Sequence, residues 1–427
     1  MKFYMLALGC KVNAYERDAI KEALIERGDV EVFKPEEASL IIVNTCSVTA
    51  TSDQKSRQQI RKMNRLSPNA VIAVMGCYSE GHLEEAEELE ADVIIGTSNR
   101  DKLLQYIDKV MLDGNKIVDV SYLSRTKRYE ELGAPAFTNN TRAQLKVQDG
   151  CDKFCSYCLI PFVRGNSRSR KKEDALKEVK SLIERGYSEI VLTGIEVGFY
   201  GFDLYGKNYG LGELIEDIIV ENPRLRRLRL SSLDVSEITP KILDDFRKYD
   251  KLMPHIHLSL QSGSESVLKR MKRNYTKDQY LEKITTLRNI RPDIAITTDI
   301  IAGFPGETDE EWKETGDFAK KCEFAEIHVF PYSARKGTAA ANMKGQVDPM
   351  VKEQRVKELL AVSRSLRNEY EKKFYGKEVE VLFEDYDKTE GYSYGHTGNY
   401  LLVKQKSPAS MHDIFAKVVY DEDSKAD

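Results

Sequence analysis

The first third of the chain alternates short apolar runs with amphipathic stretches. The apolar runs are bounded by polar or turn residues and lie at 3–8, 39–44, 70–76 and 92–96. Continuous apolar runs of this length are typical of buried parallel strands, which are covered on both faces. Between them, the residues near 14–27, 49–65 and 83–90 follow the helical period. The pattern predicts a doubly wound α/β domain over residues 1–125.

The middle of the chain shows a different rhythm, in which six apolar runs alternate with longer helical patterns such as 171–186 and 277–290. Six successive βα units predict an incomplete (β/α)6 barrel, in a domain at 137–370, with its active site at the carboxyl ends of the strands. The apolar runs lie at 143–150, 189–194, 225–232, 255–262, 294–301 and 325–333.

The last part of the chain, 371–427, is rich in short β-type runs that are split by glycine and by the string SPAS. These runs predict a small antiparallel β-barrel, and such barrels commonly bind nucleic acids through basic and aromatic side chains. A solvated β-surface with scattered tyrosines is the alternative. A helical stretch at 350–374 comes before it and is expected to pack on the central barrel. The candidate RNA-binding residues are Tyr392, Tyr394, His396, Tyr400, Lys404 and Lys406.

Length and composition agree with a cytoplasmic protein of several domains. The 427 residues, of which 41% are hydrophobic, are enough for about three domains of ~150 residues with buried cores. No run approaches the ~20 apolar residues of a membrane span, and the amino terminus lacks the features of a signal peptide. We therefore expect no membrane partner. Seven cysteines, an odd number, fit thiolate ligands in a reducing compartment better than disulfides.

The net charge of −4 argues against binding to nucleic acid through bulk charge, so any RNA contact must use local basic clusters. Solvated charged surfaces are the alternative for each cluster. The second cluster would place positive charge beside the mouth of the predicted barrel. The three clusters are Arg57, Arg61, Lys62 and Arg65; then Arg164, Arg168, Arg170, Lys171 and Lys172; then Lys269, Arg270, Lys272 and Arg273.

The string CDKFCSYC at 151–158 contains three cysteines, Cys151, Cys155 and Cys158, which we call the loop cysteines. Three thiolates can hold three irons of a [4Fe-4S] cube, whereas ferredoxin-type clusters close all four corners with cysteine. The open iron then needs a small chelating ligand. A structural zinc loop is the alternative, but zinc sites favour CxxC pairs and four closing ligands. The CxxxCxxC spacing resembles that of the radical S-adenosylmethionine enzymes.

Three further cysteines, Cys10, Cys46 and Cys77, follow predicted strands of the first domain, and we call them the strand-end cysteines. The carboxyl ends of parallel strands meet at one edge of a sheet, where ligands bind in open α/β folds. Gly9 and Gly76 precede two of these cysteines and allow the backbone to approach a bulky ligand. We therefore predict a second cluster with one open iron. Three buried apolar thiols are the alternative.

Polar and glycine residues near the ends of the barrel strands are candidates for binding the cofactor, although such residues are also common in turns. Cys322 has no partner at ligand spacing and is expected to be an ordinary buried thiol. Three histidines, His255, His257 and His328, alternate with apolar residues and are expected to line the barrel without binding a metal. The cofactor candidates are Tyr157, Gly194, Glu196, Ser231, Ser232, Gln261, Ser262, Asp299 and Tyr332.

Eight strings, spread over essentially the whole chain, resemble the radical methylthiotransferases. Within that family, the first string is similar to the branch that acts on N6-threonylcarbamoyladenosine in tRNA. The isopentenyladenosine branch more often carries a GCQMN-like string, and the ribosomal-protein branch a GCPKN-like one. Two residues depart from the family pattern: Ala14, where glutamine is common, and Glu196, at a variable position near the cofactor. The strings are LGCKVN (8–13), NTCSVT (44–49), GCYSE (76–80), VQDGCDKFCSYCLIPFVRG (147–165), RSR (168–170), LSLQSGSESVLKRMKRNYT (258–276), DIIAGFPGET (299–308) and HVFPYSARKGT (328–338).

The resemblance implies a methylthiotransferase domain, a radical barrel and a carboxyl-terminal TRAM domain that helps to hold tRNA. It implies that the loop cysteines hold a [4Fe-4S] cluster that binds S-adenosylmethionine. One electron would cleave this cofactor to a radical, and the radical would remove hydrogen from carbon 2 of the adenosine at tRNA position 37. The strand-end cysteines would hold a second [4Fe-4S] cluster that carries the sulfur, and a second S-adenosylmethionine would methylate it. The implied partners are a tRNA anticodon stem-loop and a flavodoxin- or ferredoxin-type electron donor, with the enzyme as a monomer.

Three alternatives stay open at this point. The same chemistry could act on another tRNA adenosine or on a ribosomal protein, or the chain could be a non-enzymatic iron-sulfur protein that binds RNA. Three cysteines per cluster argue against the last, because a structural site has no reason to keep an open iron. The basic and aromatic carboxyl-terminal strands and the LGCKVN string favour tRNA over a ribosomal protein.

Overall fold

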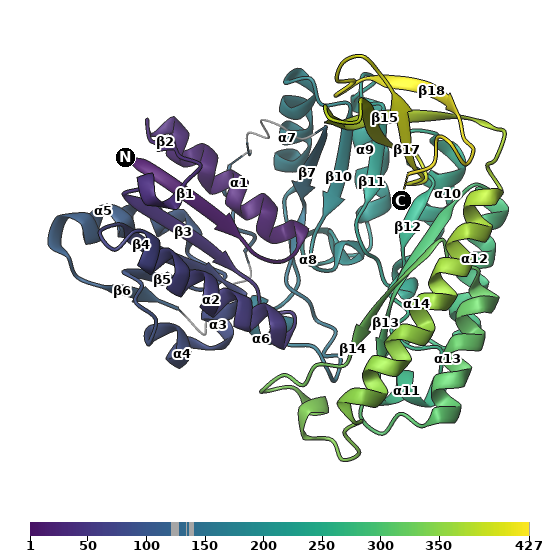
Figure 1. Ribbon diagram of the computed structural model, residues 1–427, viewed down its shortest axis with the longest axis horizontal. Helices are drawn as coiled ribbons and strands as arrows, with labels where there is room; N and C mark the ends of the chain where they lie inside the picture. The colour runs from purple at the N-terminus through teal and green to yellow at the C-terminus, as the bar shows by residue number, and fades with distance from the viewer. Residues whose placement is uncertain (121–127, 134, 136–140, 427) are drawn as a thin grey trace.

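The computed structural model describes residues 1–120, 128–133, 135 and 141–426. Three units follow one another along the chain: an amino-terminal α/β domain, a partial barrel and a carboxyl-terminal antiparallel sheet (Figure 1). This confirms the fold class predicted from the sequence. The expected domain limits at 125, 137 and 427 lie outside the described residues.

The amino-terminal sheet has six parallel strands in the order β2-β1-β3-β4-β5-β6. Four of them are the predicted strands, and β3, which is buried along its whole length, lies next to β1 and β4. The other two were missed because two or three residues show no readable periodicity. The strands are β1 (Lys2–Ala7), β2 (Val30–Glu31), β3 (Leu40–Thr45), β4 (Val71–Gly76), β5 (Val93–Ile95) and β6 (Ile117–Asp119).

Helices cover both faces of this sheet, as the prediction of a doubly wound domain requires. One face carries α1 (Lys11–Glu26) and α5 (Leu103–Asp113), which pack on alternate residues of the strands. The other face carries α2 (Ala50–Leu66), α3 (Cys77–Gly81) and α4 (Leu83–Glu87). Two separate apolar clusters, one on each side, hold the layers together.

The barrel has six parallel strands in two groups of three, β7-β10-β11 and β12-β13-β14. Backbone bridges at Leu228–Leu252 and Leu233–Leu258 join the two groups. The predicted incomplete barrel is therefore confirmed, and one large apolar cluster fills the space between its strands and outer helices. The strands are β7 (Arg142–Lys146), β10 (Glu189–Thr193), β11 (Arg227–Leu230), β12 (His255–His257), β13 (Ala295–Ala302) and β14 (Glu326–Pro331), and a small ribbon is formed by β8 (Gln148–Asp149) and β9 (Arg168–Ser169).

The outer helices of the barrel begin with clear local signals. In α13 the Thr308 side chain caps the helix and Glu311 bonds back to it, which satisfies backbone N–H groups of the first turn. Lysines in the last turn complement the helix dipole. The helices are α6 (Ile160–Arg164), α7 (Lys172–Glu184), α8 (Phe202–Tyr205), α9 (Leu211–Glu221), α10 (Pro240–Lys248), α11 (Glu265–Arg270), α12 (Lys277–Ile290), α13 (Asp309–Cys322) and α14 (Pro349–Lys372).

The carboxyl-terminal unit is a four-stranded antiparallel sheet in the order β17-β16-β15-β18, curved into a half-barrel. Its strands are β15 (Glu378–Asp387), β16 (Tyr392–Thr397), β17 (Leu402–Lys406) and β18 (Phe415–Val419). The sheet covers the amino-terminal ends of the barrel strands (Figure 1). There Arg229 of β11 donates hydrogen bonds to the carbonyls of Thr397 and Gly398 at 2.8 and 2.7 Å.

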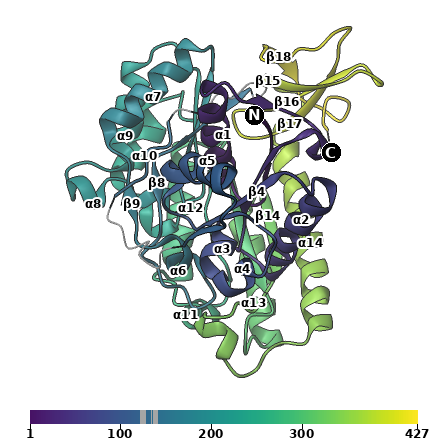
Figure 2. The same cartoon turned by 90° about the vertical axis from the view of Figure 1, so that its left-hand side faces the viewer.

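The amino-terminal domain packs against the flank of the barrel, and the first turn of α1 lies near β7 (Figures 1 and 2). Helix α14 runs along the outside of β14. Among the helices of the described residues, none has the length and apolar character needed to cross a membrane.

Candidate active site

The strand-end cysteines lie at one edge of the amino-terminal sheet. Cys10 follows β1, Cys46 follows β3 directly, and Cys77 is the first residue of α3 after β4. The sheet order places these three strands side by side. The Cys46 and Cys77 side chains are buried, whereas Cys10 is exposed, and each of the seven cysteines of the chain is a free thiol. The thiols of Cys10 and Cys46 both act electrostatically on that of Cys77. The structure thus brings together the three residues that the strand-end argument singled out.

The two glycines before Cys10 and Cys77 are required by the local backbone. Gly9 and Gly76 have φ angles of +107° and +109°, a region that other residues rarely adopt. A Cβ at Gly9 would lie 2.7 Å from the Cβ and Sγ of Cys46, and one at Gly76 would lie 2.5 Å from a backbone oxygen. The close approach expected from the sequence is therefore present, and it places the backbone at Gly9 directly against the Cys46 side chain.

The Cys77 thiol combines deep burial with a cationic neighbour. Burial raises its pKa to about 12, while the Arg164 guanidinium opposes this effect. The Nε of Arg164 donates a hydrogen bond to the Cys77 Sγ at 3.3 Å. Buried thiols with a raised pKa become thiolates when a metal replaces the proton, and an N–H group directed at the sulfur then stabilises the negative charge. This donor set fits an iron-sulfur cluster.

The loop cysteines lie between β8 and α6, and the backbone fastens their loop to the barrel. The Cys151 N–H donates to the carbonyl of Gly165 at 3.0 Å, and the Ser156 N–H donates to that of Met271, next to α11, at 3.1 Å. Burial raises the pKa of Cys158 to about 12 and raises that of Cys151 as well. The structure brings all three thiols into one electrostatically coupled group.

A guanidinium also faces the loop cysteines. The Nη1 of Arg273 donates a hydrogen bond to the Cys155 Sγ at 3.4 Å. The Arg273 side chain is only 7% exposed and also pairs with Asp234, so it lies inside the barrel and not on the RNA-binding surface predicted for its cluster. Both cysteine groups therefore have the same donor chemistry: three thiols and one arginine N–H on a sulfur. Each fits a cube with one corner left for another ligand.

Several predicted cofactor residues surround the loop cysteines. The Glu196 carboxylate accepts a hydrogen bond from the Cys151 thiol at 3.7 Å and lies 3.3 Å from the Lys153 Nζ. Tyr157 and Tyr332 belong to one apolar cluster near the loop, and the Tyr332 hydroxyl has no hydrogen-bond partner among the described residues. These side chains form a wall with both polar and apolar parts beside the cysteines.

Gly194 and Glu196 both contact Gln148, a residue that the sequence did not single out. The Gln148 amide accepts a hydrogen bond from the Glu196 N–H at 2.8 Å and donates to the carbonyl of Gly150 at 2.7 Å. A Cβ at Gly194 would lie 2.9 Å from the Gln148 Oε1, so glycine allows this close approach. Gln148 thus connects the end of β10 to the start of the cysteine loop.

The remaining candidates separate into two groups. Ser231, Ser232 and Asp299 line a cavity inside the barrel. Gln261 has a left-handed backbone with φ of +69° and donates its N–H to the carbonyl of Asp299 at 2.8 Å. Ser262 does not line the cavity, because it is fully buried and its hydroxyl contacts that of Thr315 in α13 at 3.2 Å.

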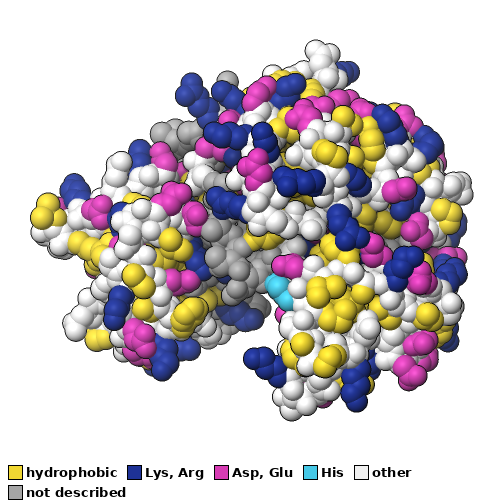
Figure 3. All heavy atoms as spheres, turned by 90° about the horizontal axis from the view of Figure 1, so that it is seen from above, with side chains coloured by type: hydrophobic (Ala, Val, Ile, Leu, Met, Phe, Trp, Pro, Cys, Tyr) yellow, Lys and Arg dark blue, Asp and Glu magenta, His cyan; other side chains and the backbone are white. Residues whose placement is uncertain are grey.

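The cavity has a volume of about 620 Å³ and takes its walls from all three units of the chain. Figure 3 shows a hollow between the amino-terminal domain and the barrel, with a histidine and an acidic side chain at its edge. The amino-terminal domain contributes Lys11, and the carboxyl-terminal sheet contributes His396 and Tyr400. These last two were predicted to bind RNA, and the structure places them in the wall of the cavity. The remaining lining residues are Arg142, Leu230, Ser231, Ser232, His255, His257, Thr297, Asp299, Glu326, His328, Arg367 and Leu402.

The histidines line the barrel as predicted, but two of them form a cluster that the sequence did not indicate. The His257 Nε2 lies 3.3 Å from a carboxylate oxygen of Asp299, and the His257 and His328 rings stack with centroids 5.7 Å apart. One donor atom from each of these three residues lies within 4.8 Å of the other two. They come from three different strands, so no local spacing could reveal the cluster. Cys322 is fully buried in the apolar core, as expected.

The prediction for the second basic cluster was wrong for its three arginines. Arg164, Arg168 and Arg170 are at most 4% exposed. Arg168 pairs with Asp149 at 3.1 Å, and Arg170 pairs with Glu131 at 2.7 Å. Acidic residues distant in sequence neutralise these charges, which removes them from any RNA surface. The first cluster stays at the surface: Arg61, Lys62 and Arg65 on α2 are exposed and line a shallow hollow.

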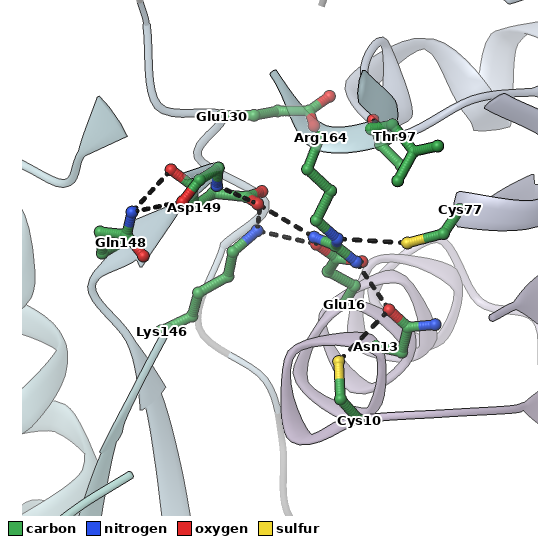
Figure 4. Close-up of polar contacts among 12 residues, drawn as sticks. Cys10, Asn13, Glu16, Cys77, Thr97, Glu130, Lys146, Gln148, Asp149 and Arg164 are labelled. Carbon is green, nitrogen blue, oxygen red and sulfur yellow. Dashed lines mark hydrogen bonds and ion pairs between the residues drawn. The ribbon is translucent and has the colours of Figure 1, made fainter. Parts of the chain in front are cut away.

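A buried ion network lies beside Cys10 and Cys77, between the amino-terminal domain and the barrel (Figure 4). Glu16 of α1 accepts hydrogen bonds from Lys146 at 2.8 Å and from Arg164 at 2.9 Å, and it also pairs with Arg100. Arg164 further donates to Asn13 at 2.6 Å and contacts Asp149 at 3.1 Å. Burial by itself raises the pKa of Glu16, but the three cations hold it well below its usual range. The network fixes the amino-terminal domain against the barrel.

Replacing Glu16 by glutamine is expected to weaken this contact strongly. The change leaves three buried cations short of one negative charge, and removing one partner from a buried ionic group typically costs ~3–5 kcal/mol. We expect a lower urea midpoint of unfolding. Glu26→Gln, on an exposed residue of the same helix, is the matched control and should unfold like the wild type. Equal midpoints for the two variants would show that the network does not hold the domains together.

Comparisons with known proteins agree with this geometry. Residues 145–319 match the radical SAM superfamily, and residues 2–96 match an uncharacterized protein family, UPF0004. The threonylcarbamoyladenosine tRNA methylthiotransferase MtaB of Bacillus subtilis is 42% identical, over 96% of this chain and 92% of its own length. The protein of the same name from Aquifex aeolicus is 35% identical, over 90% and 92%.

A tRNA-2-methylthio-N(6)-dimethylallyladenosine synthase from Geobacillus kaustophilus is 34% identical, over 91% of this chain and 74% of its own length. Among solved structures, the radical S-adenosylmethionine methyltransferase TsrM from Kitasatospora setae superposes with a TM-score of 0.59 at 14% identity, over 80% of this chain and 77% of that one. At that identity the likeness shows a shared fold.

Proposed function

This chain belongs to the tRNA methylthiotransferases of the radical S-adenosylmethionine superfamily, and we propose that it transfers a methylthio group to carbon 2 of N6-threonylcarbamoyladenosine at position 37 of tRNA. Membership of the superfamily implies a [4Fe-4S] cluster and S-adenosylmethionine. The observation that carries the proposal is the pair of convergent three-thiol groups, one in each of the two units that the buried network around Glu16 and Arg164 holds together.

The loop cysteines are the proposed ligands of the cluster that binds S-adenosylmethionine, and the strand-end cysteines those of a second [4Fe-4S] cluster that carries the sulfur. The two arginine N–H groups on Cys77 and Cys155 support both assignments, because hydrogen bonds to the sulfurs stabilise a thiolate-rich cluster. Two S-adenosylmethionine molecules are used per product, one for the radical and one for the methyl group.

The cofactor supplies the hard chemical step, because the hydrogen on carbon 2 of adenine is far too weakly acidic for any side chain to remove. The chain itself binds and orients the reactants. Tyr157 and Tyr332 present an apolar surface that excludes water near the loop cysteines. Gly194, Glu196, Ser232, Gln261 and Asp299 are the proposed polar contacts of S-adenosylmethionine and the nucleotide.

The cavity inside the barrel is the proposed chamber for the target nucleotide. An anticodon loop can direct a base outward at a low cost in unstacking, which a duplex cannot. The exposed Arg61, Lys62 and Arg65 of α2 and the outer residues of the carboxyl-terminal sheet, the proposed TRAM domain, are suited to hold the tRNA. Tyr392 and Lys404 already contact each other there, with the ammonium 5.9 Å from the ring centroid. A flavodoxin- or ferredoxin-type protein is the proposed electron donor. The enzyme itself is proposed to act as a monomer in the cytoplasm.

Mass spectrometry of tRNA nucleosides from cells that lack the gene tests the proposal. We expect 2-methylthio-N6-threonylcarbamoyladenosine to disappear while N6-threonylcarbamoyladenosine accumulates, and the gene on a plasmid should restore the product. Loss of the methylthio group from the dimethylallyl nucleoside, or from a ribosomal protein, would assign the same chemistry to another substrate. No change in any nucleoside or protein would favour a non-enzymatic iron-sulfur protein.

A further inference from the structure

Lys11 lies between the proposed sulfur-carrying cluster and the proposed nucleotide chamber. It follows Cys10 directly, begins α1, and lines the cavity inside the barrel together with residues from β11, β12 and β13. Helix α1 has 16 residues, no side-chain cap at its start and no acidic residue in its first turn. The positive end of its dipole therefore stays uncompensated at this wall of the cavity.

Lys11 is also the cation of the cavity wall that has no counter-ion among the described residues. Arg142 pairs with Glu189 at 3.0 Å and also with Glu384. Arg367 pairs with Glu371 at 2.9 Å. Lys11 is exposed, and its side chain has neither an ion pair nor a hydrogen bond in the described part of the chain. A free positive charge at a concave wall is suited to bind an anionic group of a ligand.

Two neutral side chains that line the same cavity as Lys11 each have a polar atom without a partner among the described residues. The Ser231 side chain is 6% exposed, and its Oγ has no hydrogen-bond partner among the described residues. The same holds for the Nδ1 of His255. Burial lowers the pKa of His255, and Arg229, His257 and Lys11 lower it further, so this ring is neutral at pH 7. The wall thus offers one cation and two neutral hydrogen-bonding groups.

The proposed substrate carries groups that match this wall. Its N6 substituent is a carbamoyl group joined to threonine, with a carboxylate and a hydroxyl. Carbon 2 and the N6-bearing carbon of adenine flank the same ring nitrogen, so the substituent projects from the edge that reacts. Cys10 belongs to the proposed cluster that delivers sulfur to carbon 2. The residue next to Cys10 on the cavity side is therefore placed to meet the substituent.

We propose that Lys11 binds the carboxylate of the threonylcarbamoyl group, with Ser231 and His255 at its hydroxyl and carbamoyl groups, and that this subsite selects threonylcarbamoyladenosine over an uncharged N6 substituent. The inference rests on the proposed function and adds to it a residue that determines specificity. It assigns no chemical step to Lys11.

The test uses reconstituted holoenzyme and anticodon stem-loops that carry either threonylcarbamoyladenosine or its methyl ester, which lacks the negative charge. For Lys11→Met we expect the Kd and KM for the acid stem-loop to rise by about 10- to 100-fold, the loss of one charge-assisted hydrogen bond. The ester stem-loop should bind the variant and the wild type equally. Lys11→Arg should restore most of the preference for the acid. Lys109→Met, on an exposed residue of α5, is the matched control.

Iron content and the absorbance of the cluster are measured for every variant, so that a damaged cluster is recognised. Lys11→Met with intact iron and unchanged Kd for the acid stem-loop would overturn the inference. An equal loss of affinity for acid and ester would overturn it as well, since Lys11 would then contact another part of the RNA. Wild-type enzyme that makes no methylthio product from the acid stem-loop would instead reject the proposed function, and the Kd values for acid and ester would still decide on the subsite.

Discussion

Cys155→Ala is expected to reduce the formation of 5′-deoxyadenosine from S-adenosylmethionine to the background without enzyme. The thiol is 9% exposed and takes part in the only three-cysteine loop of the sequence, and Arg273 donates a hydrogen bond to its sulfur. Two remaining thiols hold an iron cube poorly, and Cys322, the one cysteine outside the two groups, lies in the apolar core. Anaerobic incubation of reconstituted protein with dithionite, followed by chromatography of the products, measures the effect.

Cys322→Ala is the matched control for this experiment. It also removes a buried free thiol, but one packed between α13 and the barrel, away from both cysteine groups. This variant should lose some stability and keep the formation of 5′-deoxyadenosine. If Cys155→Ala produces 5′-deoxyadenosine as fast as Cys322→Ala, the radical chemistry does not use the loop cysteines.

Cys46→Ala is expected to separate the two halves of the reaction. The loop cysteines and their contacts stay intact, so S-adenosylmethionine should still be cleaved to 5′-deoxyadenosine. The strand-end cysteines lose one thiol of three, so we expect no methylthio nucleoside and about half the iron of the wild type, as one of two clusters is lost. The measurements are iron analysis, 5′-deoxyadenosine and the methylthio nucleoside, made on the same preparation.

Two outcomes for Cys46→Ala would contradict the assignment of the second cluster. Normal methylthiolation of tRNA would show that Cys46 carries no sulfur-bearing iron. Full iron content together with lost product would show that Cys46 acts in another way, for instance by positioning the base. Comparison with Cys155→Ala makes the result specific, because that variant should lose both products while this one loses one.

The buried network around Glu16 and Arg164 is expected to fix the distance and the orientation between the two proposed clusters. Glu16 belongs to α1, which begins beside Cys10, and Arg164 ends α6, which follows the loop cysteines. Their hydrogen bond of 2.9 Å joins the two helices inside the protein. In the proposed reaction one cluster serves radical formation and the other delivers sulfur to the same carbon of the nucleotide, so the rate depends on how precisely the two sites are held relative to each other. We therefore propose that this contact positions the two sites for the reaction in addition to stabilising the fold.

The sequence by itself determined the longer strands and helices of the α/β units and singled out the six cysteines as candidate ligands. Runs such as 39–44 and 70–76 are apolar throughout because parallel strands are covered on both faces, and that pattern is local. The cysteines at the ends of β1, β3 and β4 could then be placed together, because neighbouring parallel strands end at the same edge. The loop cysteines lie within eight residues, so their convergence needed no tertiary information.

Only the tertiary structure decided where charge is neutralised and which polar groups meet. Arg164, Arg168 and Arg170 form a basic string in the sequence. In the structure they are buried, and Glu16, Asp149 and acidic residues of other segments form ion pairs with them. His257, Asp299 and His328 come together from three strands, and Lys11 faces them from another domain. The physical reason is that backbone periodicity depends on residues a few positions apart, whereas the electrostatic environment of a side chain depends on groups brought near by packing, whatever their distance along the chain.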